Sequence, residues 1–165
     1  MIQAYISLGS NIGKRDENLQ IAFNMISKLG EVKGSHIYKT EPWGREDLPE
    51  FLNACVFIRT NCSIKDLFFN LCFIEEKMGR KKKGKWEPRI IDLDLLLIKG
   101  IIFKTPKLVV PHPLLRERNF YLEPLSEIAE EEIEPISGEK IKNLLLKSPD
   151  KKKVWKTGSI LQLRE

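Results

Sequence analysis

The sequence has few of the features that mark secreted, redox-active or membrane-bound proteins. Its three cysteines, Cys55, Cys62 and Cys72, are odd in number and lack the spacing of a metal site. This usage is typical of reduced, buried thiols in the cytosol and gives no indication of a redox role. No uninterrupted apolar run approaches the roughly 18 residues of a membrane span, and residues 1–4 carry no basic leader. We therefore expect a cytoplasmic protein without a membrane partner.

Length and composition limit the chain to one domain. With 165 residues, of which 42% are hydrophobic and 31% are charged, it can bury one sizeable core. The sequence has no internal repeat, and we expect residues 1–165 to form a single domain. The net charge of +5 favours anionic ligands, although the cations gather at residues 80–89 and 151–156 and an acidic stretch covers residues 123–134.

A complete phosphate-binding glycine motif is also missing. Residues 9–15, Gly-Ser-Asn-Ile-Gly-Lys-Arg, imitate one, but the two glycines are one residue too close, and Arg15 stands where a Ser or Thr would hold magnesium. We interpret the segment as a turn between a strand and a helix. Ser10 or Asn11 would cap the helix, and Gly9 would let a ligand approach the sheet closely. If the chain binds ATP, side chains and metal must hold the phosphates.

What the sequence does contain is a pair of carboxylates inside an apolar run. Residues 89–98 read Arg-Ile-Ile-Asp-Leu-Asp-Leu-Leu-Leu-Ile, and strand geometry directs Asp92 and Asp94 to one face. Two like charges that leave water are costly unless a cation joins them. Oxygen ligands favour a hard ion such as Mg²⁺, with substrate phosphates completing its shell. The alternative is a strand whose aspartates are neutralised by Arg89 and nearby lysines.

The residues before this strand form a basic segment. Residues 80–89 carry six cations and one acid, and Gly84 and Pro88 interrupt regular structure around Trp86. Taken alone, a run of lysines is equally consistent with a solvated surface loop. Next to a carboxylate pair that can hold metal, the cations can instead help to neutralise a polyphosphate. Together the two features indicate phosphoryl transfer.

The hydrophobic pattern predicts strands that alternate with two amphipathic helices. Helical spacing covers residues 19–29 and 64–78, and residues 52–58 alternate as a half-buried strand does. The order strand, helix, strand, strand, helix, strand predicts an α+β fold. We expect a ferredoxin-like sandwich, with an antiparallel sheet and helices packed on it.

Local signals mark the ends of some of these elements. Ser63 with Asp66 resembles a capping box that opens the second helix, and Gly79 stands at a C-cap position. In the last thirty residues or so, the pattern indicates one short helix around residues 141–145. Residues 151–165 carry no recognisable chemistry.

These motifs resemble those of the 6-hydroxymethyl-7,8-dihydropterin pyrophosphokinase family of folate biosynthesis. The resemblance is most specific in residues 86–96, which contain the core Pro-Arg-x-x-Asp-Leu-Asp, and it covers about residues 2–135. Further segments follow in the family's order, at residues 5–11, 38–44, 51–54, 74–75, 78–80, 110–113 and 118–120. The resemblance implies transfer of a diphosphate from ATP to the hydroxymethyl oxygen of the pterin, giving pterin diphosphate and AMP.

The resemblance also implies roles for individual residues. Asp92 and Asp94 would hold two Mg²⁺ ions, and Arg80 and Arg89 would clamp phosphate oxygens as catalytic residues. The residues implied in ATP binding are Glu75, Lys82, Lys83, Trp86, Lys107, His112 and Arg118, with the choice between the two neighbouring lysines open. Those implied in pterin binding are Thr40, Pro42, Trp43, Phe51, Asn53 and Phe120.

From the residues alone, some of these assignments have simpler explanations. Phe51 and Phe120 fit a hydrophobic core as well as a ligand pocket. A single histidine such as His112 is more often structural than functional. Glu87 and Val109 depart from the usual family pattern, as does Pro113, so we expect differences from the family in the phosphate contacts.

Two other functions remain to be separated from this one. A nucleic-acid-binding module would agree with basic loops on a ferredoxin-like sheet, but Asp92 and Asp94 would repel a phosphate backbone. We therefore expect small-molecule substrates and no nucleic acid. An ordinary kinase that moves only the γ phosphate would release ADP instead of AMP.

Overall fold

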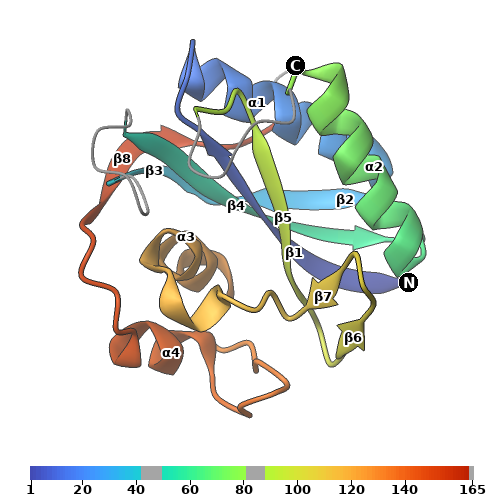
Figure 1. Cartoon of the computed structure of the whole chain (residues 1–165), viewed down its shortest axis with the longest axis vertical. Helices are drawn as coiled ribbons and strands as arrows, with labels where there is room; N and C mark the ends of the chain where they lie inside the picture. Colours follow the sequence, from blue (N-terminus) through green and yellow to red (C-terminus); the bar gives the residue numbers. More distant parts are fainter. Residues whose placement is uncertain (42–49, 81–87, 164–165) are drawn as a thin grey trace.

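A computed structural model describes residues 1–41, 50–80 and 88–163 of the chain. The chain forms an α+β structure in which one large sheet is covered by helices (Figure 1). In chain order its elements are β1 (Ile2–Ser10), α1 (Arg15–Ile26), a 3₁₀ turn (Ser27–Leu29), β2 (Glu31–Gly34), β3 (His36–Thr40), β4 (Phe51–Thr60), α2 (Ile64–Lys77), β5 (Asp92–Ile98), β6 (Phe103–Lys104), β7 (Val109–Val110), a second 3₁₀ turn (Leu115–Glu117), α3 (Asn119–Ala129), α4 (Ile141–Lys147) and β8 (Val154–Ile160).

The main sheet is antiparallel in all its pairings. Its hydrogen-bonded order is β5-β1-β4-β3-β8, and β2 also pairs with β4. The central pair, β1 and β4, runs in register from Ile2 opposite Thr60 to Ser10 opposite Leu52. The predicted α+β class and antiparallel sheet are therefore confirmed.

Both predicted helices are present, and α2 has the expected end signals. The Ser63 hydroxyl accepts a hydrogen bond from the main-chain nitrogen of Asp66 at 3.1 Å and so caps α2. Gly79 follows α2 with a φ of +88°, a left-handed conformation that glycine adopts without steric cost. The short helix predicted near residue 141 is α4.

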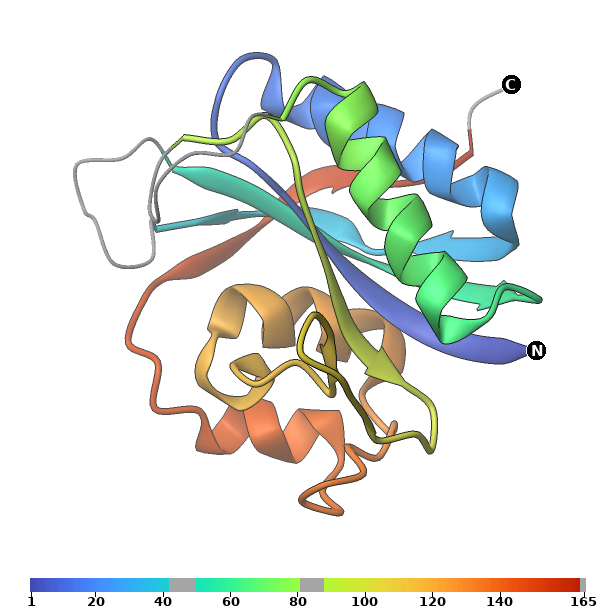
Figure 2. The ribbon, with the colours of Figure 1, turned by 45° about the vertical axis from the view of Figure 1, so that its right-hand side comes forward.

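Helices cover both faces of the sheet. α1 and α2 lie on one face, and α3 and α4 lie on the other (Figures 1 and 2). Because side chains alternate along a strand, β1 contributes to two cores. Ala4, Ile6 and Leu8 join the core beneath α1 and α2, whereas Tyr5 joins the core that includes α3 and α4. On the same face of β1 as Tyr5, the next residues are Ser7 and Gly9, and their small size leaves space between β1 and α3.

α3 and β8 are the longest of the elements that were not predicted from the sequence. α3 contains Pro124, which removes a backbone hydrogen bond inside the helix, and a proline is seldom found in the interior of a helix. β8 pairs with β3 at the edge of the sheet, but most of its side chains are exposed, so it lacks the alternating pattern of a half-buried strand. The C-terminal residues without recognisable chemistry thus complete the sheet.

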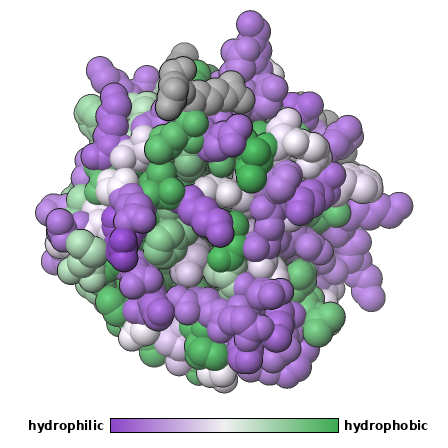
Figure 3. Space-filling view, turned by 180° about the vertical axis from the view of Figure 1, so that it is seen from behind, coloured by the Kyte–Doolittle hydropathy of each residue, from purple (hydrophilic) through white to green (hydrophobic). Residues whose placement is uncertain are grey.

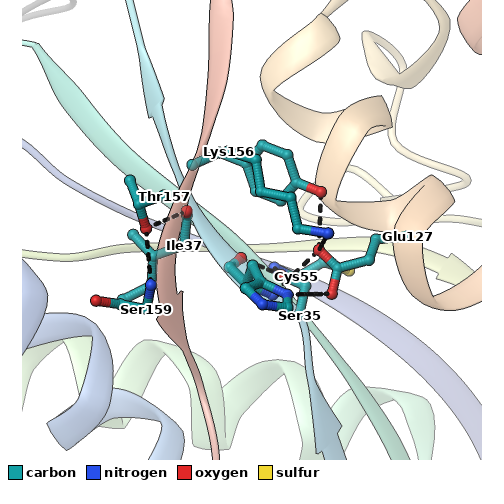
Figure 4. Close-up of polar contacts among 9 residues, drawn as sticks. Ser35, Ile37, Cys55, Glu127, Lys156, Thr157 and Ser159 are labelled. Carbon is teal, nitrogen blue, oxygen red and sulfur yellow. Dashed lines mark hydrogen bonds and ion pairs between the residues drawn. The ribbon is translucent and has the colours of Figure 1, made fainter.

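Glu127 anchors α3 to the sheet. Its carboxylate accepts hydrogen bonds from the main-chain nitrogen of His36 at 3.0 Å and from the Tyr38 hydroxyl at 2.7 Å, and Lys156 Nζ of β8 lies 3.8 Å away (Figure 4). Burial alone would raise the pKa of Glu127, but the hydrogen bonds from His36 and Tyr38 hold it below its usual value. The helix is therefore fixed relative to β3 and β8.

The turn after β1 differs from the sequence prediction. Lys14 occupies the N-cap position of α1 without a side-chain capping bond, so neither Ser10 nor Asn11 is the cap. Asn11 Oδ1 instead accepts a hydrogen bond from the main-chain nitrogen of Arg89 at 2.7 Å. The side chain is used to hold the residues that precede β5, which is a long-range contact that local sequence signals do not reveal.

The prediction of buried thiols is correct for only one cysteine. Cys55 is buried, whereas Cys62 and Cys72 are partly exposed, and all three are free. Cys72 lies on a face of α2 that borders a cavity, which explains its exposure.

One face of the molecule is of mixed polarity (Figure 3). Hydrophobic residues are interrupted by hydrophilic ones on the face seen from behind (Figure 3). Within the described ranges, no helix combines the length and the apolar content needed to cross a membrane.

Candidate active site

Asp92 and Asp94 share one face of β5, as the alternation of a strand predicts. Between them, Leu93 turns to the opposite face and joins the core beneath α1 and α2. In the neighbouring strand β1, Gly9 lies opposite Asp92 and Ser7 lies opposite Asp94. Residues opposite each other in an antiparallel pair point to the same face. The small residues of β1 therefore leave room beside both carboxylates.

Two arginines partly neutralise Asp92. Its Oδ1 lies 3.2 Å from Arg80 Nη1 and 3.4 Å from Arg89 Nη1. Burial and the charge of Asp94 nevertheless raise the pKa of Asp92 above its ordinary value, because the arginines offset only part of these effects. The sequence left open whether Arg89 neutralises the aspartates of this strand. In the structure Arg89 does lie beside Asp92, and Arg80 lies there as well.

The carboxylates suit a hard divalent cation but do not complete its shell. They offer oxygen ligands, which Mg²⁺ prefers. Among the described residues, no group of three or more His, Cys, Asp or Glu side chains is placed to hold a metal ion. A cation at Asp92 and Asp94 would therefore take its remaining ligands from water or from substrate phosphates.

Glu75 of α2 connects Arg80 to β5. Its Oε2 accepts a hydrogen bond from the main-chain nitrogen of Leu93 at 2.9 Å and forms an ion pair with Arg80 Nη1. Burial raises the pKa of Glu75 to about 7, although the hydrogen bond from Leu93 and the charge of Arg80 oppose this shift. Glu75 thereby holds the Arg80 guanidinium beside Asp92.

Tyr121 of α3 holds Asp94. The Tyr121 hydroxyl donates a hydrogen bond to Asp94 Oδ2 at 2.6 Å and accepts one from Arg118 Nη1 at 3.0 Å. Burial, and then the charge of Asp94, raises the pKa of Tyr121 well above its ordinary value, so the phenol keeps its proton. The two carboxylates of β5 are therefore oriented by different partners.

His112 presents a neutral ring to the same space. Its main-chain nitrogen donates to the Leu96 carbonyl at 2.8 Å, and its Nδ1 accepts from the main-chain nitrogen of Leu114 at 3.1 Å. Because Nδ1 is the acceptor, the proton of the neutral imidazole lies on Nε2. Burial, and then the nearby Arg118 charge, lowers the pKa of His112 to about 4. At neutral pH the ring is thus an uncharged hydrogen-bond donor.

An amide and two aromatic rings form another part of the site. The Thr40 hydroxyl donates to Asn53 Oδ1 at 2.7 Å, and both side chains are buried, so the Asn53 amide is fixed with its Nδ2 left to donate. Phe51 of β4 and Phe120 of α3 line the same space. This combination of flat apolar surfaces and one oriented polar group is typical of a site for a flat heterocycle.

A single cavity of about 510 Å³ unites these groups. Its walls include eleven site candidates from the sequence: Thr40, Phe51, Asn53, Glu75, Arg80, Arg89, Asp92, Asp94, His112, Arg118 and Phe120. Lys107 is exposed in the turn between β6 and β7 and does not line the cavity. Five further candidates, Pro42, Trp43, Lys82, Lys83 and Trp86, lie outside the described residues, as does Glu87.

Sequence reasoning missed several residues of the cavity wall. Phe68, Leu71 and Cys72 line it together with Glu75. Their spacing of three, four and seven residues places them on one stripe of α2, but the hydrophobic pattern was used only to predict a helix over residues 64–78. A charged residue, Glu75, on the same stripe was the one sign in the sequence that this face of α2 borders a cavity. Tyr121 was missed because the helix that carries it was not predicted.

Comparisons with known proteins agree on one family. The family model described as 7,8-dihydro-6-hydroxymethylpterin-pyrophosphokinase (HPPK) matches residues 5–130. The 2-amino-4-hydroxy-6-hydroxymethyldihydropteridine pyrophosphokinase of Aquifex aeolicus is 37% identical over 137 residues, which are 82% of this chain and 86% of that relative. The protein of the same name from Bacillus subtilis is 42% identical over 131 residues, 78% of each chain.

Solved structures show the same fold. An HPPK-DHPS in complex with substrates has a TM-score of 0.68 at 17% identity, and wild-type HPPK-DHPS of Plasmodium falciparum with STZ-DHP has 0.69 at 16%. Each similarity covers 88% of this chain but only 43% of the longer HPPK-DHPS chain. With the matched motifs, the family model and the relatives in agreement, the chain belongs to the 7,8-dihydro-6-hydroxymethylpterin-pyrophosphokinase family.

Proposed function

We propose that this chain transfers the diphosphate of ATP to the hydroxymethyl oxygen of 6-hydroxymethyl-7,8-dihydropterin in folate biosynthesis. The observation that carries the proposal is the pairing of Gly9 with Asn53 on one side and with Asp92 on the other. A heterocycle-binding amide and a metal-binding carboxylate are thus separated only by a residue without a side chain. Membership of a family named for this pyrophosphokinase activity supports the same reaction.

The pterin would bind at the aromatic end of the cavity. Its ring would lie between Phe51 and Phe120, where each aromatic contact contributes beyond simple burial. Asn53 Nδ2 would donate to its polar edge, because Thr40 already occupies Asn53 Oδ1. The hydroxymethyl group would then extend past Gly9 toward Asp92 and Asp94. Pro42 and Trp43, which lie outside the described residues, are also proposed to bind the pterin.

ATP would bind at the cationic end. Arg80, Arg89 and Arg118 line the cavity, and a guanidinium can bind two phosphate oxygens at once. His112 would add a neutral donor through its Nε2 proton. Lys107 and one of Lys82 and Lys83 would supply further charge, and Trp86 would help residues 80–89 to cover the nucleotide and exclude water.

Two Mg²⁺ ions are proposed at Asp92 and Asp94, where they would polarise the phosphoryl oxygens and offset the charge on the leaving AMP. The chain's own residues would bind and orient the two substrates. The rings and the amide position the hydroxymethyl oxygen for attack on the β phosphorus, while the arginines hold the phosphates. The bond between that phosphorus and the oxygen retained by AMP breaks, and the hydroxyl proton is released. The family resemblance assigns no dedicated general base.

Other properties follow from the same proposal. Residues 1–165 would act as one pyrophosphokinase domain, and the order of elements from β1 to β5 would correspond to a ferredoxin-like sandwich, because β1 and β4 form the centre of the antiparallel sheet. The substrates would be ATP and the pterin, without nucleic acid or membrane. A cytoplasmic location would agree with three free thiols.

Product analysis tests the proposal. The full chain is incubated with ATP, Mg²⁺ and the reduced hydroxymethylpterin, and the nucleotides and pterins are separated by chromatography. AMP and pterin diphosphate should appear in equal amounts, and neither should form when the pterin or Mg²⁺ is omitted. ADP as the main nucleotide product would overturn the proposal in favour of γ-phosphate transfer.

A further inference from the structure

We propose that Tyr121 is a positioning residue for Asp94, and that its hydroxyl links the cation-binding carboxylate to Arg118. The inference deepens the proposed function and rests on it, because it assumes that Asp94 binds a divalent cation. Tyr121 is outside every motif that points to the family, and its role is visible only in the folded chain.

The direction of the hydrogen bonds is determined by the groups involved. Ionised Asp94 can only accept, and the Arg118 guanidinium can only donate. The single proton of the Tyr121 hydroxyl therefore points to Asp94 Oδ2, 2.6 Å away, and a lone pair accepts from Arg118 Nη1 at 3.0 Å. This arrangement engages one oxygen of Asp94 and leaves Oδ1 to bind a cation.

The position of the hydroxyl is itself fixed by packing. Tyr121 is 2% exposed. The centroid of its ring lies 5.1 Å from that of His112 and 4.6 Å from that of Phe120. A side chain packed among such neighbours cannot easily move its terminal oxygen. Asp94 is consequently held by a rigid group.

Tyr121 also differs in kind from the partners of Asp92. Arg80 and Arg89 bring positive charge to Asp92 and compete with a cation for it. Tyr121 orients Asp94 through a neutral donor and separates it from the charge of Arg118, so Asp94 keeps more of its attraction for a divalent ion than Asp92 does. Groups that hydrogen-bond a ligating carboxylate in this way commonly affect metal affinity about 10–100-fold. Asp94 is therefore the better pre-formed ligand of the two.

A Tyr→Phe change isolates this contribution, because it removes the hydroxyl and keeps the ring that contacts Phe120 and His112. The matched control is Tyr38→Phe. The Tyr38 hydroxyl also donates to a carboxylate, that of Glu127 at 2.7 Å, but at the other end of α3. Unfolding midpoints of both variants check that the chain remains folded.

The measurement is Mn²⁺ binding to the full chain in the presence of a non-hydrolysable ATP analogue, followed by calorimetry and by electron paramagnetic resonance. Tyr121→Phe should weaken Mn²⁺ binding by about tenfold or more and leave pterin affinity within twofold of the wild type. Tyr38→Phe should change neither. Unchanged Mn²⁺ binding in Tyr121→Phe, or equal losses for Mn²⁺ and pterin, would overturn the inference.

A second pair of variants tests whether Tyr121 acts through Asp94. If it does, adding Tyr121→Phe to Asp94→Asn should change the affinity for the ATP analogue in Mg²⁺ by less than about twofold, since coupled residues are not additive. A further tenfold loss in the double variant would contradict the assignment. Wild-type Mn²⁺ binding and AMP formation test the proposed function separately, so the two can fail independently.

Discussion

Gly9 in β1 lies directly opposite Asn53 in β4, and a methyl group built on Gly9 would come 2.7 Å from Asn53 Nδ2. Side chains do not pack that closely, so one of the two would have to move. The Asn53 amide is not free to turn aside, because Thr40 donates a hydrogen bond to its oxygen. The absence of a side chain at Gly9 therefore keeps the amide in place beside the carboxylates.

Gly9→Ala should weaken pterin binding by about tenfold, roughly the effect of one misplaced hydrogen bond. The affinity for an ATP analogue should change less than twofold, because the displaced group lies on the pterin side. Calorimetry with each ligand measures the difference. Gly158→Ala in β8 is the matched control, since nothing lies within 4 Å of its new methyl group. Unchanged pterin affinity in Gly9→Ala would show that Asn53 does not contact the pterin.

Asp92→Asn should separate activity from stability. Loss of an electrostatic contact to the transition state should lower turnover at least about a hundredfold. The pKa of Asp92 is raised in the folded chain, so its ionised form costs stability once the pH exceeds the folded pKa. At neutral pH the uncharged Asn should therefore leave the free energy of unfolding equal or higher.

Asp94→Asn should lower turnover to a similar extent. Asp66→Asn, at an exposed position in the first turn of α2, is the control for both variants and should have normal activity. Turnover is measured at limiting Mg²⁺ and the free energy of unfolding is measured in urea. Near-normal turnover in both site variants would refute the metal assignment.

The sequence was most informative where one local rule determines the geometry. The pleat of a strand alone places Asp92 and Asp94 on one face, and Ser63 and Gly79 cap α2 by contacts within a few residues. Asn11 shows the opposite case. Its side chain binds Arg89, 78 residues away, and no local pattern distinguishes this use from helix capping.

The same distinction applies to the site. Chemically distinctive residues such as Arg80 and His112 could be found from the motifs, and the structure brings both to the cavity. Tyr121 could not be found from the sequence, because its hydrogen bond to Asp94 forms only when α3 packs against the sheet. The helix α3 was itself not predicted, and it contains Pro124. Lys107 is a third case: the family pattern selects it for ATP binding, the structure places it at an exposed turn outside the cavity wall, and its role stays a prediction.

Phe51→Ala and Phe120→Ala should each weaken pterin binding by more than about 1 kcal/mol, the value expected of a peripheral contact. Binding of the ATP analogue should fall by a smaller factor, because a flat apolar ring stacks on a heterocycle and brings no charge to phosphates, although the Phe120 ring lies 5.4 Å from the Arg118 guanidinium. Phe69→Ala is the control, since Phe69 is 58% exposed on α2. Equal losses of pterin and ATP affinity would indicate a general packing role for the two rings.

His112 should remain uncharged at pH values well below neutral. Burial and the charge of Arg118 lower its pKa to about 4 in the folded chain, whereas an unfolded chain has a histidine pKa of about 6.5. Between these values the unfolded state binds the proton and the folded state does not. His112 therefore makes a contribution to stability that is present above about pH 6.5 and is lost as the pH falls toward 4.

His112→Asn should remove this dependence with little structural change, because the Asn oxygen can accept the hydrogen bond that Leu114 now gives to Nδ1. Urea unfolding of both proteins at pH 7 and pH 5 measures the effect. The wild type should lose more free energy of unfolding than the variant between these pH values, and the two should change alike between pH 7 and pH 8, where His112 stays neutral in both states. Equal losses between pH 7 and pH 5 would mean that His112 is as easily protonated in the fold as in the unfolded chain, and a neutral donor to phosphate would then be the wrong role for it.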